Sequence, residues 1–155
     1  MPSTVRHTAW DALKRVARYL KGTPELTLIL QKGVGGAQGS IRLSMYVDAS
    51  YACCPDTGRS ISGHAICLNG NVVFASSKRQ ETVACSTTEA ELIALSEGCK
   101  DLIYAHRLIS QFHPVELPMV VHEDNLSTID VMNNPVNNGR TKHIAVRHFW
   151  ARELI

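Results

Sequence analysis

Alternation of apolar and polar residues marks the first part of the main region of the chain. In the segment 41–49 every second residue is apolar, which predicts a strand with one buried face. Segments 61–68 and 72–76 also read as strands, and the Asn-Gly-Asn tripeptide between them is a strong hairpin signal. Turn residues fill 55–60. Short connections between consecutive strands predict an antiparallel meander of three strands.

A long helix is expected after the meander, from about Thr87 to Phe112. Ser86, followed three residues later by Glu89, forms a capping box that marks a helix start. Glu89 and Glu91 lie on different faces, because two residues turn roughly 200° around a helix. Glu91 continues an apolar stripe made of Leu95, Gly98, Leu102 and Ile109, whereas Glu89 continues a mostly polar stripe made of Ile93, Ser96, Glu97 and Lys100. Glu91 is therefore predicted to lie on the buried side of its helix.

Shorter elements complete the main region. The sequence predicts a fourth strand at 119–122, a short helix at 125–132 and a last helix at about 142–155. A strand–helix–strand passage requires a crossover connection, which places the strand 119–122 parallel to a strand of the meander.

The N-terminal region has a different pattern. Residues 8–20 are expected to form an amphipathic helix, and residues 26–31 a short strand. The glycine-rich segment 33–40 reads as a flexible linker. These boundaries predict an N-terminal extension, 1–40, followed by one main domain, 41–155. Trp10 and Trp150 are expected to anchor hydrophobic cores.

Composition narrows the class of protein. The 155 residues are 45% hydrophobic and 19% charged, as in an ordinary globular domain. The net charge of +2 is compatible with nucleic acid but does not indicate it. No segment approaches the roughly 18 apolar residues that a membrane span needs, and the charged N-terminal helix does not resemble a signal peptide. We therefore expect an intracellular protein without a membrane partner.

Three carboxylates are expected to meet at one end of the sheet. Asp48 lies near the end of the first strand and Asp124 follows the fourth. If these two strands are neighbours, both carboxylates meet where parallel strands collect ligands. The start of the helix that carries Glu91 leads into the same place. Clustered carboxylates suit Mg²⁺ or Mn²⁺, typically as a two-metal site for phosphoryl chemistry. On spacing alone, the alternative is that these are ordinary strand-end and helix-start charges.

A series of motifs resembles one known family. In order along the chain they are Tyr46-Val47-Asp48-Ala49-Ser50, Gly58-Arg59-Ser60-Ile61-Ser62-Gly63, Ser76-Ser77-Lys78-Arg79-Gln80, Ser86-Thr87-Thr88-Glu89-Ala90-Glu91-Leu92, Glu123-Asp124-Asn125 and Arg140-Thr141-Lys142-His143-Ile144. Together they resemble the ribonuclease H domain of copia-type retrotransposon polyproteins. The segment Arg18-Tyr19-Leu20-Lys21-Gly22-Thr23 resembles the region that joins reverse transcriptase to that domain.

The resemblance implies a fold, an activity and a set of site residues. The implied fold is α/β and ribonuclease H-like, with a mixed sheet of a three-strand meander plus one parallel strand. The implied activity is endonucleolytic hydrolysis of the RNA strand of RNA–DNA hybrids, with Asp48, Glu91 and Asp124 holding two Mg²⁺ ions that Mn²⁺ can replace. The residues expected to contact nucleic acid are Lys78, Arg79, Ser86, Thr87, Asn125, Arg140 and Lys142. Loop charges and helix caps are the alternative roles for these residues.

The resemblance also implies a setting for the protein. It predicts a reverse transcriptase domain of the same polyprotein as a partner, and the cytoplasm, the nucleus or a retroelement particle as the location.

The chain departs from the family pattern at its C-terminus. The family carries a fourth metal-binding aspartate in a helix after a final strand, and the sequence ends before both. We therefore expect the domain to be incomplete, with an exposed edge on the fourth strand that favours dimerisation. The alternative function is a catalytically impaired remnant that binds nucleic acid or protein.

Overall fold

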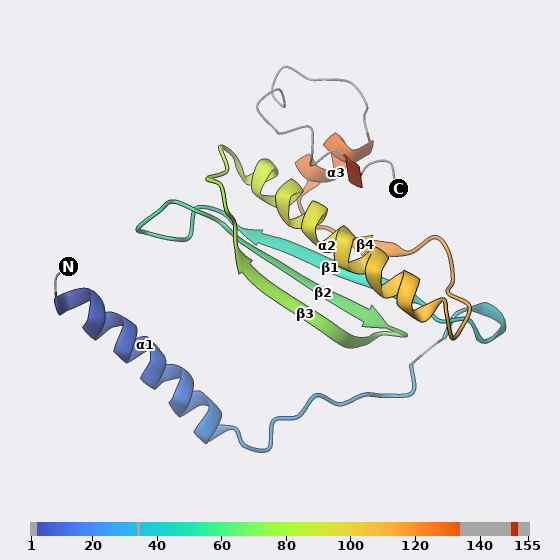
Figure 1. Ribbon diagram of the computed structural model, residues 1–155, viewed down its shortest axis with the longest axis horizontal. Coiled ribbons are helices and arrows are strands. Elements are labelled where there is room, and N and C mark those ends of the chain that lie inside the picture. Colours follow the sequence, from blue (N-terminus) through green and yellow to red (C-terminus); the bar gives the residue numbers. More distant parts are fainter. Residues whose placement is uncertain (1–2, 34, 134–149, 152–155) are drawn as a thin grey trace. The chain divides into compact units, whose positions relative to one another are not determined.

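The chain folds as two compact units, Met1–Leu30 and Gln31–Ile155. The computed structural model describes residues 3–33, 35–133 and 150–151 (Figure 1). In this part of the chain, no helix combines the length and the apolar character that crossing a membrane requires.

The first unit contains one helix, α1, at Ser3–Gly22. The helix begins five residues before the expected start at residue 8. Trp10 is 56% exposed rather than a core anchor, because residues 3–30 contain no second helix or strand to cover the apolar stripe. The strand expected at 26–31 is wrong, since these residues form neither helix nor strand. Apolar residues alone do not make a strand without a neighbour to accept its backbone hydrogen bonds.

The second unit is built on a four-stranded sheet (Figure 1). Its strands are β1 (Leu43–Ser50), β2 (Ile61–Leu68), β3 (Asn71–Arg79) and β4 (Val120–His122), in the spatial order β3-β2-β1-β4. The β1–β2 and β2–β3 pairs are antiparallel, and β4 is parallel to β1. The expected meander and the parallel fourth strand are therefore both confirmed.

Within the described residues, two α-helices follow the meander. Helix α2 spans Thr87–Ile109 and α3 spans Leu126–Asn133. The capping box is confirmed, because the backbone N–H of Glu89 donates to Ser86 Oγ at 3.1 Å. The Glu89 carboxylate accepts from the backbone N–H of Cys85 at 2.7 Å, so both residues satisfy amides at the helix start. The sheet and its flanking helices form an α/β architecture consistent with the expected ribonuclease H-like fold.

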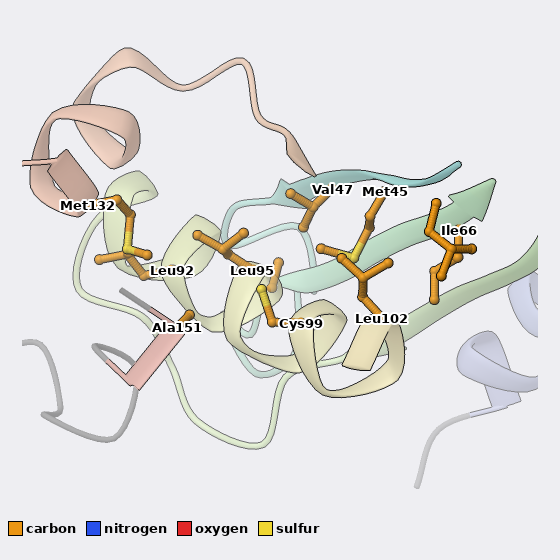
Figure 2. Close-up of a cluster of buried hydrophobic side chains, with 11 residues drawn as sticks. Met45, Val47, Ile66, Leu92, Leu95, Cys99, Leu102, Met132 and Ala151 are labelled. Carbon is orange, nitrogen blue, oxygen red and sulfur yellow. The ribbon is translucent and has the colours of Figure 1, made fainter. Parts of the chain in front are cut away.

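The hydrophobic core lies between α2 and the sheet (Figure 2). Side chains of β1 and β2 such as Met45 and Ile66 meet Leu95 and Leu102 of the helix, and all four are at most 3% exposed. The apolar stripe predicted from Glu91 is thus the face that packs on the sheet. Helix and sheet approach closely at Gly98, where an added Cβ would lie 2.8 Å from Met45 Sδ.

The stripe predicted to be polar is partly wrong. Ser96 is 2% exposed and Ile93 is 5% exposed, so α2 is covered on this side as well. Trp150 explains the burial of Ser96, because its indole Nε1–H donates to Ser96 Oγ at 2.6 Å. Trp150 also packs against the core cluster, as expected, and Ala151 is fully buried there. The rest of the helix expected at 142–155 lies outside the described residues.

The linker also differs from expectation. Within the glycine-rich segment, Ala37–Gly39 form a 3₁₀ turn, and Ser40 closes it by donating its hydroxyl to the carbonyl of Ala37 at 2.7 Å. The next residue, Ile41, pairs with Val115 in an isolated parallel bridge before β1 begins. The segment is therefore held by hydrogen bonds rather than extended as a free linker.

Candidate functional site: a carboxylate cluster at the end of the sheet

Parallel pairing brings Asp48 and Asp124 to the same end of the sheet. Tyr46 of β1 pairs with His122 of β4. Asp48 lies two residues after Tyr46, and Asp124 lies two residues after His122. Both aspartates are exposed. The carboxyl ends of β1 and β4 thus carry one accessible carboxylate each, at the position where parallel sheets collect ligands.

Glu91 faces this end of the sheet from the first turns of α2. It is 6% exposed, and its Oε2 atom is buried with no hydrogen-bond partner among the described residues. Burial is the largest cause that raises the pKa of Glu91, and the charges of Glu123, Asp48 and Asp124 add to it; against a backbone hydrogen bond from Ala49, the pKa reaches about 7. A buried carboxylate among three others is the least stable charge in this region.

Glu123 is a fourth carboxylate of the site, and the sequence reasoning did not single it out. Its Oε1 accepts from the backbone N–H of Asn125 at 2.9 Å, while its Oε2 is buried with no partner in the described part of the chain. Burial raises the pKa of Glu123, and Asp124 and Asp48 add to the rise. The signal in the sequence was the adjacent pair Glu123-Asp124 after a strand, of which only the second residue was considered. We call Asp48, Glu91, Glu123 and Asp124 the carboxylate cluster.

The carboxylate cluster has the chemistry of a site for a hard divalent cation. Its donors are all oxygens, as Mg²⁺ and Mn²⁺ prefer, and two buried oxygen atoms, on Glu91 and Glu123, lack hydrogen-bond partners within the described residues. A cation would neutralise charges that now oppose one another. Across residues 3–33, 35–133 and 150–151, however, no three His, Cys, Asp or Glu side chains are close enough to hold one ion together. The residues fit the ion in chemistry and in charge, while the side chains do not form a closed set of ligands.

Two basic residues lie at the same end of the sheet. Lys78 and Arg79 end β3 and pair with Ser62 and Ile61 at the start of β2, which in turn lies beside the end of β1. Both side chains are exposed. The register therefore places two cations at the same end of the sheet as the carboxylate cluster, where they are available to phosphates.

The expected polar contacts with nucleic acid divide into three groups. Ser86 and Asn125 act as helix caps, since Asn125 Oδ1 accepts from the backbone N–H of Thr128 at 3.0 Å. Thr87 is exposed at the start of α2. Arg140 and Lys142 lie outside the described residues. Contact of any of these residues with nucleic acid stays a prediction.

Comparison with known proteins adds relatives to this geometry. The chain is 36% identical over 146 residues to the retrovirus-related Pol polyprotein from transposon TNT 1-94 of Nicotiana tabacum, and 33% identical over 147 residues to that from transposon RE2 of Arabidopsis thaliana. Each match covers 94% of this chain and 10% of the relative, so the chain spans about a tenth of the length of these polyproteins.

No family model matches the chain. A third relative is a different kind of protein. Secreted RxLR effector protein 161 of Plasmopara viticola is 41% identical over 97 residues, which are 63% of this chain and 65% of that protein. The two longer matches cover nearly all of the sequence, including the sheet, α2 and the carboxylate cluster. Over almost its whole length, the chain is therefore homologous to one segment of the retrovirus-related Pol polyproteins of plant transposons.

Proposed function

We propose that the chain is the ribonuclease H domain of a copia-type retrotransposon polyprotein and hydrolyses the RNA strand of RNA–DNA hybrids. The observation that carries the proposal is Glu91, a carboxylate 6% exposed that faces three others where the parallel strands β1 and β4 end. A folded chain keeps such a costly group where its charge has a use. The Pol polyprotein homologues and the α/β fold point to the same activity.

Asp48, Glu91 and Asp124 are the proposed ligands of two Mg²⁺ ions. When bound, the ions supply an activated water for in-line attack on the phosphodiester and stabilise the leaving oxygen, which yields 3′-hydroxyl and 5′-phosphate ends. The exposed Asp48 and Asp124 are accessible to a substrate phosphate. Because the pKa of Glu91 is raised to about 7, its deprotonation and the uptake of a cation are coupled.

Recognition of the hybrid is assigned to the basic residues at the same end of the sheet. Lys78 and Arg79 would contact phosphates, which position a duplex without reading its sequence. Discrimination between RNA and DNA would come from the 2′-hydroxyl and from duplex shape. Arg140 and Lys142 belong to the same proposal. A reverse transcriptase domain of the same polyprotein is the proposed protein partner.

A second candidate function is a module that binds nucleic acid or protein without cleaving it. The observation in its favour is that the described residues contain no three acidic, histidine or cysteine side chains close enough to hold one ion. In this reading, the basic residues still bind a duplex, while the carboxylates fail to assemble a working site.

Cleavage of an end-labelled RNA–DNA hybrid separates the two functions. The wild-type chain is assayed with Mg²⁺ and with Mn²⁺, beside Asp48→Asn and a matched Asp56→Asn control in the exposed turn after β1. The nuclease proposal expects cleavage that Asp48→Asn abolishes and Asp56→Asn retains. Binding of the hybrid without cleavage, at all metal concentrations, would establish the second function instead.

A further inference from the structure

Gln80 joins three elements of the second unit from a buried position directly after β3. It is 2% exposed, and its backbone N–H donates to the carbonyl of Ser60 at 2.9 Å. Its side-chain Nε2 donates to Ser62 Oγ on β2 and to the carbonyl oxygen of Ala90 in α2, each at 2.9 Å. One amide group therefore connects the end of β3, the start of β2 and the first turn of α2.

The orientation of this amide is fixed by its partners. A backbone carbonyl only accepts hydrogen bonds, so the NH₂ group of Gln80 has to face Ala90. The opposite atom, Oε1, is buried and has no partner among the described residues. The side chain thus leaves one acceptor unsatisfied while it keeps both donors engaged. The Ala90 contact is maintained at the expense of a hydrogen bond elsewhere.

The Ala90 carbonyl belongs to the peptide that leads into Glu91. Ala90 is fully buried, and its N–H donates to the carbonyl of Ser86 at 3.1 Å, so it sits in the turn that the cap starts. First turns of helices fray most readily, because their amides lack partners within the helix. The Ser86 cap holds this turn from its outer end, and Gln80 holds it from the side of the sheet. Any rotation of the Ala90–Glu91 peptide would carry the Glu91 carboxylate with it.

We propose that Gln80 is a positioning residue, which holds the peptide before Glu91 and so aims the Glu91 carboxylate at the end of β1 and β4. The role of that carboxylate in binding a metal rests on the proposed function. The position of the peptide does not. Partners that hold a ligand in place commonly contribute a large share of metal affinity without touching the ion.

Two substitutions separate positioning from general stability. Gln80→Met keeps the size of the side chain and removes both hydrogen bonds from its amide. Ser62→Ala removes the other acceptor of the same amide and leaves the Ala90 contact in place. Both variants lose packing or hydrogen bonding at one buried location, so a purely structural role predicts similar effects from the two.

Mn²⁺ affinity of the full chain, measured by titration calorimetry, is the first readout. We expect Gln80→Met to weaken binding by about 10- to 100-fold, and Ser62→Ala to leave it unchanged. Higher Mg²⁺ concentrations should then restore hybrid cleavage in Gln80→Met, because the loss is in metal affinity rather than in the maximal rate. Equal Mn²⁺ affinities of the two variants would overturn the proposal.

Backbone amide hydrogen exchange is the second readout, and it depends on neither metal nor activity. Positioning predicts faster exchange in Gln80→Met for the amides of the first turns of α2, with no change around Leu102. Uniformly faster exchange along α2, or equal exchange in both variants, would overturn it. If the wild-type chain binds no Mn²⁺, the proposed function fails, and this exchange comparison alone decides the role of Gln80.

Discussion

At the scale of single residues, the cluster combines two exposed carboxylates with one that is half-buried and one that is buried. Glu91 is as little exposed to solvent as a core residue, yet it faces Asp48, Glu123 and Asp124. Its burial follows from its place on the apolar stripe of α2, which was visible in the sequence. The burial of Glu123 was not visible, because it depends on how the chain turns after a strand of only three residues.

The first prediction concerns the pH dependence of stability. The pKa of Glu91 is about 7 in the folded chain and 4.5 in the unfolded chain, so the folded chain holds this proton more tightly. The contribution of Glu91 to stability in a metal-free buffer should therefore be complete below pH 4.5, fall as the pH rises to 7, and be lost above it. The fall attributable to Glu91 is at most about 3 kcal/mol, at about 1.4 kcal/mol per pKa unit.

Chemical denaturation of wild type and Glu91→Gln at pH 5 and pH 8 checks this prediction. The substitution should flatten the fall and make the variant the more stable protein at pH 8. Glu123→Gln removes the largest of the three carboxylate contributions to the pKa of Glu91 and should give an intermediate profile. Identical pH profiles for all three proteins would contradict the prediction.

The second prediction concerns divalent cations. At pH 8 Glu91 is ionised, so Mg²⁺ or Mn²⁺ should raise the melting temperature of the wild-type chain. At a metal concentration 100 times the dissociation constant, binding raises the free energy of unfolding by about 2.7 kcal/mol. Differential scanning fluorimetry with and without the metal measures it, and Glu91→Gln should show a smaller gain. A melting temperature that does not respond to either metal would count against the proposed site.

At the scale of elements, alternation and capping residues predicted where strands and helices lie better than they predicted which helix faces are buried. The strands 61–68 and 119–122, the helix start at Ser86 and the parallel placement of β4 were all predictable from local patterns. Ser96 was assigned to the wrong environment, because its partner Trp150 lies 54 residues away in sequence. Helical periodicity predicts which face of a helix packs on a sheet. It does not predict that a distant segment of the chain will cover a second face.

The packing of α2 on the sheet gives the third prediction. Gly98 faces Met45, which is fully buried, and the ring of His64, whose Nε2 lies 2.8 Å from Asp101 Oδ2. Gly98→Ala gains about 1 kcal/mol of helix propensity, while crowding of a packed core costs about 1–3 kcal/mol. Because the end of the fully buried Met45 side chain would have to shift inside the core, we expect a net loss of stability of about 1 kcal/mol, measured by chemical denaturation.

A second variant tests the cause of that loss. In a Met45→Ala background, which empties the space opposite the helix, Gly98→Ala should become neutral or stabilising. The same loss in both backgrounds would show that Met45 is not the residue that sets the helix-to-sheet distance.

At the scale of the whole molecule, the carboxylate cluster and the two basic residues of β3 lie at one end of the sheet of the second unit. The ends of β1, β3 and β4 and the start of α2 all lie there, so residues far apart in sequence become neighbours through register alone. Sequence reasoning located this end on the condition that the first and fourth strands are neighbours, and the order β3-β2-β1-β4 meets that condition. It could not predict whether the carboxylates would close into a set of ligands, since that depends on side-chain distances of a few ångströms.

The fourth prediction follows from this arrangement. Lys78→Ala and Arg79→Ala should each weaken binding of an RNA–DNA hybrid regardless of its sequence, and should each lower the slope of log affinity against log salt by about 1. Fluorescence anisotropy at several salt concentrations measures both effects. Lys100→Ala, exposed in the middle of α2, is the matched control and should retain the wild-type slope. An unchanged slope in the two β3 variants would remove them from the interface.

The unbalanced charge at the end of the sheet also has an evolutionary consequence. Each carboxylate there lowers the stability of the metal-free fold, so a lineage released from selection for the activity would gain stability by replacing any of the four. Substitutions would then accumulate faster in the carboxylate cluster than in the uncharged core around it. The order in which copies of such an element lose Asp48, Glu91, Glu123 and Asp124, relative to core residues such as Met45, would record when each copy stopped using the site.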